Sequence, residues 1–323
     1  MSLVSIPSNP VPEGAVSGML TAADGVKVRY ARWPATGPKR LGTVCVFPGR
    51  AEMIEKYFEV VNELRARGFA VAALDWRGQG GSARALPDPR KGHVGDFDEY
   101  QRDLDVFLRD VVLPDCPPPH FALAHSMGAA NILRAIHAGK RTFERAVLCA
   151  PMLDLWLPKY PNLSRRFAWL MTLFGMKHRY IARGGPAAVT NRPFLGNPCS
   201  SDPVRYERGA KIVEAEPSLG LGSPTYSWTA AAFRTIEEFA SPTYPSEMNH
   251  PVLILAAGED RLVSTPAIEK FAIRLRAGAF FVIPGSRHEI LMERDSIRSQ
   301  FWAAFDAFVG PRRSRVRVSC SEV

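Results

Sequence analysis

One serine lies where an apolar strand pattern ends and a helical pattern begins, in the run Ala124-His125-Ser126-Met127-Gly128. A strand-to-helix turn of this kind is tight and strained, so small residues flank the serine and its hydroxyl is held out at the edge of a sheet. Alanine replaces the usual first glycine here, and it is the next smallest side chain. We predict that Ser126 is a nucleophile suited to attack an acyl carbonyl carbon.

A serine hydroxyl needs a base to accept its proton and a carboxylate to orient that base. Both residue types follow later in the chain, because Asp260 comes after one apolar strand-like run and His288 comes after the next. Catalytic groups of open α/β sheets gather at the carboxyl ends of strands. We therefore predict a triad of Ser126, His288 as general base and Asp260 as orienting acid, with Glu259 as the only neighbouring rival to Asp260.

An acyl-transfer site also needs backbone N–H donors for the oxygen that becomes negatively charged. The residue after the nucleophile, Met127, is the first expected donor. The second is Arg50, in the loop that follows the apolar run 43–47 and reads Pro48-Gly49-Arg50-Ala51-Glu52. These two amides are the predicted oxyanion hole.

The other histidines are expected to have structural or solvated roles. His125 adjoins the nucleophile, but its side chain is expected to point away across the turn. No H-x-x-x-H or H-x-H spacing predicts a metal site. The glycine-rich stretch 75–82 lacks the lysine of a phosphate-binding P-loop and does not complete G-x-G-x-x-G, so we predict neither a metal nor a cofactor. Asp75 and Arg77 are expected to pin this loop near the site.

The elements that position these residues alternate along the chain as strand and helix. This alternation predicts an α/β fold with a mostly parallel central sheet and helices on both faces. The rhythm is broken over residues 152–245, which are rich in proline, glycine and aromatic residues. We interpret that stretch as an inserted helical cap, because a bare loop of that length is uncommon. The predicted division is a loose N-terminal arm (1–15), a core (16–151 and 246–310), the cap segment (152–245) and a basic C-terminal tail (311–323).

The composition is that of a globular protein, with 46% hydrophobic and 23% charged residues among 323. The net charge of +9 is compatible with nucleic acid, an anionic membrane or an anionic substrate. We do not predict nucleic-acid binding, because zinc-finger spacing, an RNA-binding aromatic motif and a basic region leading into heptads are all missing. Five cysteines without a C-x-x-C motif, and no recognisable signal peptide, favour the reducing cytoplasm.

Taken together, these motifs resemble those of the monoacylglycerol lipase and lysophospholipase branch of the α/β hydrolases, and most of all bacterial lysophospholipases. The branch pattern is H-G-x-x-E, D-x-R-G-x-G-x-S, the serine turn, G-x-x-D and a late histidine. The likeness covers most of residues 20–310 and is weakest in the cap segment. Three departures are Pro48 in place of the histidine of that branch, Ala124 in place of the glycine of the serine turn, and Ala257 in place of the glycine three residues before the acid.

The resemblance implies an α/β-hydrolase fold and a serine carboxylester hydrolase that releases a fatty acid from a lysophospholipid or another single-chain acyl lipid. A monoacylglycerol lipase or general esterase is the alternative. A serine aminopeptidase, a perhydrolase and a non-catalytic binder are less favoured. A dedicated aminopeptidase would need acidic cap residues to hold the substrate amine. Head group, chain length and oligomeric state stay open.

The cap segment adds a physical argument about the substrate. Residues 155–201 hold seven Lys or Arg and no Asp or Glu, together with many large apolar residues. An apolar face beside cations suits a lipid surface or a lipid with an anionic head group. The alternative is that the aromatics pack the cap onto the core and the cations are only solvated. We expect a cytoplasmic protein and leave open peripheral contact with the anionic inner face of the membrane.

Overall fold

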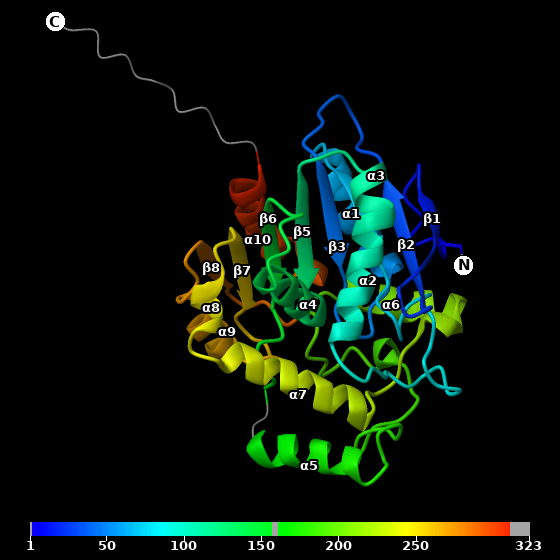
Figure 1. The fold of residues 1–323 in the computed structure, drawn as a ribbon. Coiled ribbons are helices and arrows are strands. Elements are labelled where there is room, and N and C mark those ends of the chain that lie inside the picture. Colours follow the sequence, from blue (N-terminus) through cyan, green and yellow to red (C-terminus); the bar gives the residue numbers. More distant parts are fainter. Residues whose placement is uncertain (1, 157–160, 311–323) are drawn as a thin grey trace, which may run out of the picture.

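A computed structural model describes residues 2–156 and 161–310 (Figure 1). Eight strands form one sheet in the order β1-β2-β4-β3-β5-β6-β7-β8. Their bounds are β1 Val16–Thr21, β2 Lys27–Trp33, β3 Thr43–Phe47, β4 Ala70–Leu74, β5 His120–His125, β6 Arg145–Cys149, β7 Val252–Ala257 and β8 Gly278–Ile283. From β4 to β8 neighbouring strands are parallel, whereas β2 pairs antiparallel with both β1 and β4.

The central strands are apolar along their whole length because both faces of the sheet are covered. Strands β3, β4 and β7 are buried at every residue. Helices α1 and α10 share one face, where Arg67 pairs with Asp306, and α2, α4 and α9 cover the other face (Figure 1). The bounds are α1 Phe58–Ala66, α2 Asp98–Phe107, α4 Ser126–His137, α9 Thr265–Ala272 and α10 Asp295–Val309, with the short α3 Leu113–Asp115 after α2. The predicted fold class is confirmed.

The hydrophobic core lies on both sides of this sheet and is rich in aromatic rings. On one face Phe47 of β3 packs against Trp76 and against Phe107 of α2. On the other face Phe69 packs against Phe121 of β5 and Phe305 of α10. These large buried side chains hold the carboxyl ends of the strands in a fixed relation, which is what a multi-residue site at that edge requires.

Between β6 and β7, the described part of the cap segment contributes no strand to the sheet. Its helices are α5 Pro161–Leu173, α6 Pro203–Ala215, α7 Tyr226–Ala240 and α8 Tyr244–Glu247. Helices α5 and α7 pack against each other, and α7 lies between α5 and the sheet (Figure 1). Helix α6 lies apart from this pair, next to the start of α1.

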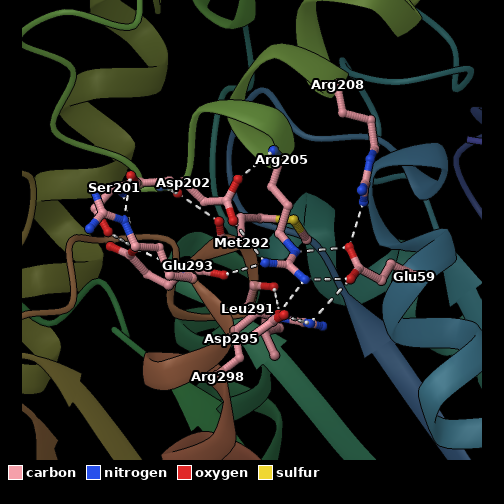
Figure 2. A network of polar contacts seen from close by, with 12 residues as sticks. Glu59, Ser201, Asp202, Arg205, Arg208, Leu291, Met292, Glu293, Asp295 and Arg298 are labelled. Atoms are coloured by element: carbon pink, nitrogen blue, oxygen red, sulfur yellow. Dashed lines mark hydrogen bonds and ion pairs between the residues drawn. The ribbon is translucent and has the colours of Figure 1, made fainter. Parts of the chain in front are cut away.

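A network of charged side chains fastens α6 to the core (Figure 2). Arg205 of α6 donates to Glu59 of α1 at 2.7 and 3.0 Å, and it pairs with Asp295 at the start of α10 at 2.6 Å. Arg208 and Arg298 bind the same Glu59 carboxylate. Because one carboxylate serves three guanidinium groups, the network joins three elements that are distant in the sequence.

The N-terminal arm is not loose, contrary to our expectation. Ile6 and Asn9 are buried, and the Asn9 side-chain amide donates to the Glu55 carbonyl oxygen. The Trp33 indole donates to the Pro12 carbonyl oxygen. A segment rich in proline can pack without forming a helix or strand when core groups satisfy its backbone, and its composition alone does not reveal this. The predicted basic tail, 311–323, lies outside the described residues.

Candidate active site

Ser126 stands at the junction of β5 and α4, on a turn that its neighbours make possible. Its φ of 50° lies in the left-handed region, which a non-glycine residue adopts only under constraint. A Cβ at Gly128 would lie 2.5 Å from the carbonyl oxygens of Phe47 and Pro48, so only glycine fits there. Ala124 is buried, and the structure accommodates its methyl group in place of the usual glycine.

The structure brings together the three residues of the predicted triad. The Nε2 atom of His288 lies 3.0 Å from Ser126 Oγ, and its Nδ1 atom lies 2.7 Å from Asp260 Oδ2. Each distance is that of a good hydrogen bond. The base is therefore within reach of the serine proton, and the acid is within reach of the ring nitrogen on the far side.

Asp260 is held as an anion by its surroundings. Burial by itself would raise its pKa, but the charge and hydrogen bond of His288 and the amides of Val263 and Leu262 outweigh burial and lower the pKa. Its side chain has no exposed surface. The rival Glu259 is exposed, and within the described residues it forms no hydrogen bond or ion pair with His288.

The two predicted oxyanion donors lie in settings where an N–H group is free to bind an incoming oxygen. Met127 is the second residue of α4, in the first turn, where amides have no acceptor within their helix. In the loop of Arg50, the amide of Gly49 donates to Glu52 and that of Ala51 donates to Gln79. No acceptor for the Arg50 amide is found within residues 2–156 and 161–310.

Contrary to our expectation, the His125 side chain does not point away from the site. Its Nδ1 atom lies 3.1 Å from Glu52 Oε2, and its Nε2 atom lies 3.2 Å from the backbone carbonyl oxygen of His288. The rings of His125 and His288 are 4.7 Å apart between centroids. A buried imidazole needs hydrogen-bond partners for both nitrogens, and only the folded chain supplies them at this point.

The partners of His125 indicate its protonation state. Burial alone would lower the pKa of His125, but the Glu52 carboxylate raises it. The pKa of Glu52 in turn is held well below its usual value by Lys56 and His125, against the effect of burial. A carbonyl oxygen and a carboxylate are both acceptors, so both ring nitrogens of His125 must donate. His125 is therefore an imidazolium buried beside the triad.

Glu52 and Gln79 support the loop that carries Arg50. Glu52 accepts hydrogen bonds from Gly49 N, Tyr57 OH at 2.6 Å and Lys56 Nζ at 2.8 Å. Gln79 donates to the carbonyl oxygens of Gly49 and Glu52. Sequence analysis missed these roles, although both residues belong to the motifs that it singled out, because a motif does not reveal which side chains meet across the fold.

The loop 75–82 is pinned as predicted. The Asp75 carboxylate accepts from Arg29 at 2.7 Å and from the amide of Ile54 at 2.9 Å. Arg77 pairs with the buried Asp103 at 2.7 Å and with Asp24 at 2.6 Å. These buried ion pairs place Gln79 against the Arg50 loop, because Gln79 lies within the same short turn.

The part of the chain that the structure describes holds neither a cluster of metal-ligating side chains nor a helix that could cross a membrane. No group of three or more His, Cys, Asp or Glu side chains there could hold a metal ion. No helix in that part of the chain is both long and apolar enough to cross a membrane.

A serine on a strained strand-to-helix turn, with acid and histidine in later post-strand loops of a mostly parallel sheet, defines the α/β-hydrolase class of serine hydrolases. Comparison with known proteins agrees. A family model described as Hydrolase_4, "Serine aminopeptidase, S33", matches residues 38–295. The chain is 32% identical to lysophospholipase L2 of Escherichia coli strain K12, over 86% of this chain and 83% of that protein. It is 24% identical to a monoacylglycerol lipase of Mycolicibacterium smegmatis, over 83% and 88%.

Among solved structures, a soluble variant of monoglyceride lipase from Saccharomyces cerevisiae superposes with a TM-score of 0.71. That comparison covers 91% of this chain and 96% of the other at 20% identity, so it concerns the fold alone. The chain belongs to the Hydrolase_4 family and is a serine hydrolase of the carboxylic ester class. The expected resemblance to the monoacylglycerol lipase and lysophospholipase branch is confirmed.

Proposed function

We propose that this enzyme releases the fatty acid of a lysophospholipid by a two-step acyl-enzyme mechanism. The observation that carries the proposal is the unbroken chain of hydrogen bonds from Ser126 Oγ through the His288 ring to Asp260. A serine so connected is suited to attack a carbonyl carbon. Its position after β5 supports the proposal, because α/β proteins bind their substrates at the carboxyl ends of the strands.

In the first step Ser126 Oγ attacks the ester carbonyl carbon while His288 Nε2 takes the hydroxyl proton. The Arg50 and Met127 amides bind the oxygen that becomes negative, and Asp260 stabilises the imidazolium. When the carbonyl re-forms, the bond to the glycerol oxygen breaks and His288 protonates that leaving oxygen. In the second step a water loses its proton to His288, attacks the acyl-serine and frees the acid. No cofactor is required.

The names of the relatives favour an acyl lipid as substrate. The relatives include a lysophospholipase L2 and a monoacylglycerol lipase, and both kinds of substrate carry one acyl chain. A monoacylglycerol is therefore the second candidate substrate. The aminopeptidase in the description of the family is less favoured, because a substrate amine needs a carboxylate partner. Glu52 and Glu289, both close to the triad, are already bound by Lys56.

Helix α5 offers a surface for lipid. Most of its large apolar side chains point to solvent although the helix packs on α7. An exposed apolar patch of this kind on a soluble fold marks a contact surface. Its members, with Trp156 before the helix and Phe174 after it, are Trp156 (48% exposed), Leu163 (63%), Phe167 (45%), Trp169 (55%), Leu170 (40%), Leu173 (62%) and Phe174 (67%).

The charged residues beside this face favour an anionic lipid surface as the partner that we propose for it. Arg166, Lys177, Arg179 and Arg183 are exposed, and none forms an ion pair with a carboxylate among the described residues. Apolar side chains that enter the interface, with cations at the level of the head groups, are the features of a peripheral helix. We propose that the enzyme works in the cytoplasm and touches the inner face of the membrane through α5.

Fatty-acid release tests the proposed function. Wild type and Ser126→Ala would be assayed on lysophosphatidylethanolamine, lysophosphatidylcholine and monoacylglycerol that carry the same acyl chain. We expect release from the lysophospholipids to be fastest and to fall by about 10⁶-fold in the variant. Hydrolysis of monoacylglycerol only would retain the triad and contradict the head group. Absence of release from all three would overturn the proposal, provided that the wild type is folded.

A further inference from the structure

The side chain of Arg50 is a half-buried cation without an acid. No carboxylate of the described residues lies within ion-pair distance of its guanidinium, whereas the buried arginines Arg29 and Arg77 each pair with two or more. Within the part of the chain that the structure describes, its only hydrogen bond runs from Nη2 to the carbonyl oxygen of Gly222 in the cap segment, at 2.6 Å. In the same part of the chain its buried Nε has no hydrogen-bond partner. An unpaired charge and a buried, unbound donor in one side chain are costly unless a ligand completes them.

The surroundings of this guanidinium favour an anion. Burial, together with the charge of Arg192, lowers its pKa to about 10, which still leaves it charged at neutral pH. Trp228 holds the group from one side at 5.2 Å, so its orientation is restricted. Arg50 also lines a small cavity between its own loop and the cap residues Thr190 and Tyr206.

The acids around this cavity do not neutralise Arg50. Glu52 and Glu289 line it as well, but Lys56 binds both, at 2.8 and 2.7 Å. The cavity has a volume of about 40 Å³. A single water needs roughly 10–15 Å³. The space is of the size of one small polar group, and an anionic group there would meet unpaired positive charge.

We propose that the Arg50 guanidinium binds the phosphate of a lysophospholipid whose ester carbonyl is held by the amide of the same residue. This inference rests on the proposed function and adds a specificity determinant to it. Two paths of covalent bonds have the same length. One joins the amide nitrogen of an arginine to its Cζ, and the other joins the ester carbonyl carbon of a 1-acyl lysophospholipid to its phosphorus. A single residue can therefore contact both ends of the glycerol unit, and a planar guanidinium fork suits phosphate oxygens.

The alternative is that Arg50 only ties the cap to the core. Arg84 provides a matched control, because it is also half-buried, has no carboxylate partner within the described residues, and donates to a carbonyl oxygen of the cap segment, that of Ser218 at 2.8 Å. Burial lowers its pKa to about 10 as well. Arg84 follows the loop 75–82 and is not adjacent to the oxyanion loop. A purely structural role of Arg50 would therefore be shared by Arg84, whereas phosphate recognition would not.

The test is the ratio of kcat/KM for lysophosphatidylethanolamine to kcat/KM for monoacylglycerol with the same chain. It would be measured in wild type, Arg50→Met, Arg50→Lys and Arg84→Met. We expect the ratio to fall about tenfold or more in Arg50→Met, since hydrogen bonds to a charged group are lost. Arg50→Lys should restore part of it, and Arg84→Met should leave the ratio near that of wild type. Thermal unfolding and fluorophosphonate labelling would establish that each variant is folded and has a reactive serine.

A second measurement does not depend on turnover of the anionic substrate. Glycerophosphoethanolamine, the deacylated product, should inhibit monoacylglycerol hydrolysis competitively in wild type and about tenfold more weakly in Arg50→Met. The inference is overturned if Arg50→Met slows both substrates to the same extent, or if Arg84→Met shifts the ratio equally. If the wild type cleaves no lysophospholipid, the proposed function itself fails and the inference fails with it.

Discussion

His125 Nδ1 lies 3.1 Å from Glu52 Oε2, and the same oxygen accepts the amide hydrogen of Gly49. This contact joins the turn of the nucleophile to the loop that supplies an oxyanion donor. The other nitrogen of His125 donates to the backbone carbonyl oxygen of His288. Three segments that carry the predicted site therefore converge on one buried ion pair.

The first prediction concerns that ion pair. Glu52→Gln should lower kcat about tenfold or more, because a neutral amide binds the His125 imidazolium and the Gly49 amide less strongly than a carboxylate. Tyr57→Phe is the matched control, since it removes one hydrogen bond to Glu52 and retains the charge. Steady-state hydrolysis of a monoacylglycerol would measure both. Full activity in Glu52→Gln would show that the pair is dispensable.

The protonation state of His125 has a spectroscopic readout of its own. In ¹⁵N-labelled protein at pH 7, both ring nitrogens of His125 should carry hydrogen, and in Glu52→Gln one of them should lose it. A raised pKa in the folded state means that the charged form stabilises the protein at low pH and that this contribution is lost as the pH rises through the folded pKa. Wild type should thus lose more stability than Glu52→Gln does as the pH rises above the ordinary histidine pKa of about 6.5.

The second prediction separates the two neighbouring acids. Asp260→Asn should lower kcat by about 10⁴-fold, because the amide favours the wrong tautomer of His288. Glu259→Gln should change kcat little, since that exposed side chain makes no bond to the histidine. Hydrolysis of a short ester at neutral pH would measure both variants. A large loss in Glu259→Gln with a small one in Asp260→Asn would reverse the assignment.

The third prediction concerns the network of Figure 2. The side chains of Arg205 and Arg208 overcome the effect of burial and lower the pKa of Glu59 to about 2. A depressed pKa means that the stabilisation is present above the unfolded value of about 4.3 and is lost as the pH falls toward 2. Denaturant unfolding between about pH 6 and about pH 3 should show a steeper loss of stability in wild type than in Glu59→Gln.

A second part of the third prediction concerns α6 of the cap segment. Arg205→Met should lower the melting temperature, because it leaves Glu59 and Asp295 with fewer partners and loosens α6. Arg102→Met is the matched control, since its exposed ion pair with Asp24 lies on the core surface. Equal melting temperatures for the two variants would contradict an anchoring role for Arg205.

The fourth prediction concerns the apolar face of α5. The double variant Leu173→Ser and Phe174→Ser should bind vesicles that contain phosphatidylglycerol about tenfold more weakly than wild type, because apolar area that enters the interface is removed. Ile273→Ser is the control, since Ile273 is 72% exposed but lies on the core at the end of α9. Flotation with the vesicles would measure the bound fraction.

Two outcomes would show whether the exposed cations and the apolar face of α5 each contribute to vesicle binding. If neutral phosphatidylcholine vesicles bind wild type as well as anionic ones do, the exposed cations beside α5 are not involved. If the double variant binds anionic vesicles as tightly as wild type does, α5 is not the contact. Added salt should weaken binding to the anionic vesicles only, since exposed charges are screened within about 10 Å at 0.1 M.

The sequence by itself determined the order of strands and helices and the loops in which the predicted site residues stand. Runs such as 43–47 and 252–256 are apolar along their length, as in strands that are buried on both faces. Such runs can be recognised from the sequence alone. Ser126, Asp260 and His288 were predicted as site residues because each follows an apolar strand-like run. Local patterns carry this information because strand period and turn chemistry depend on near neighbours.

Only the tertiary structure decided which side chains meet. It turned His125 toward Glu52, packed the N-terminal segment against Glu55, and left Arg50 without an acid while Arg205 gained several. Each of these outcomes depends on groups from distant parts of the chain. A sequence pattern indicates what a residue can bind, but packing determines which partner it meets. Burial makes an unpaired charge costly, so a buried charge is stable only where the fold supplies a partner.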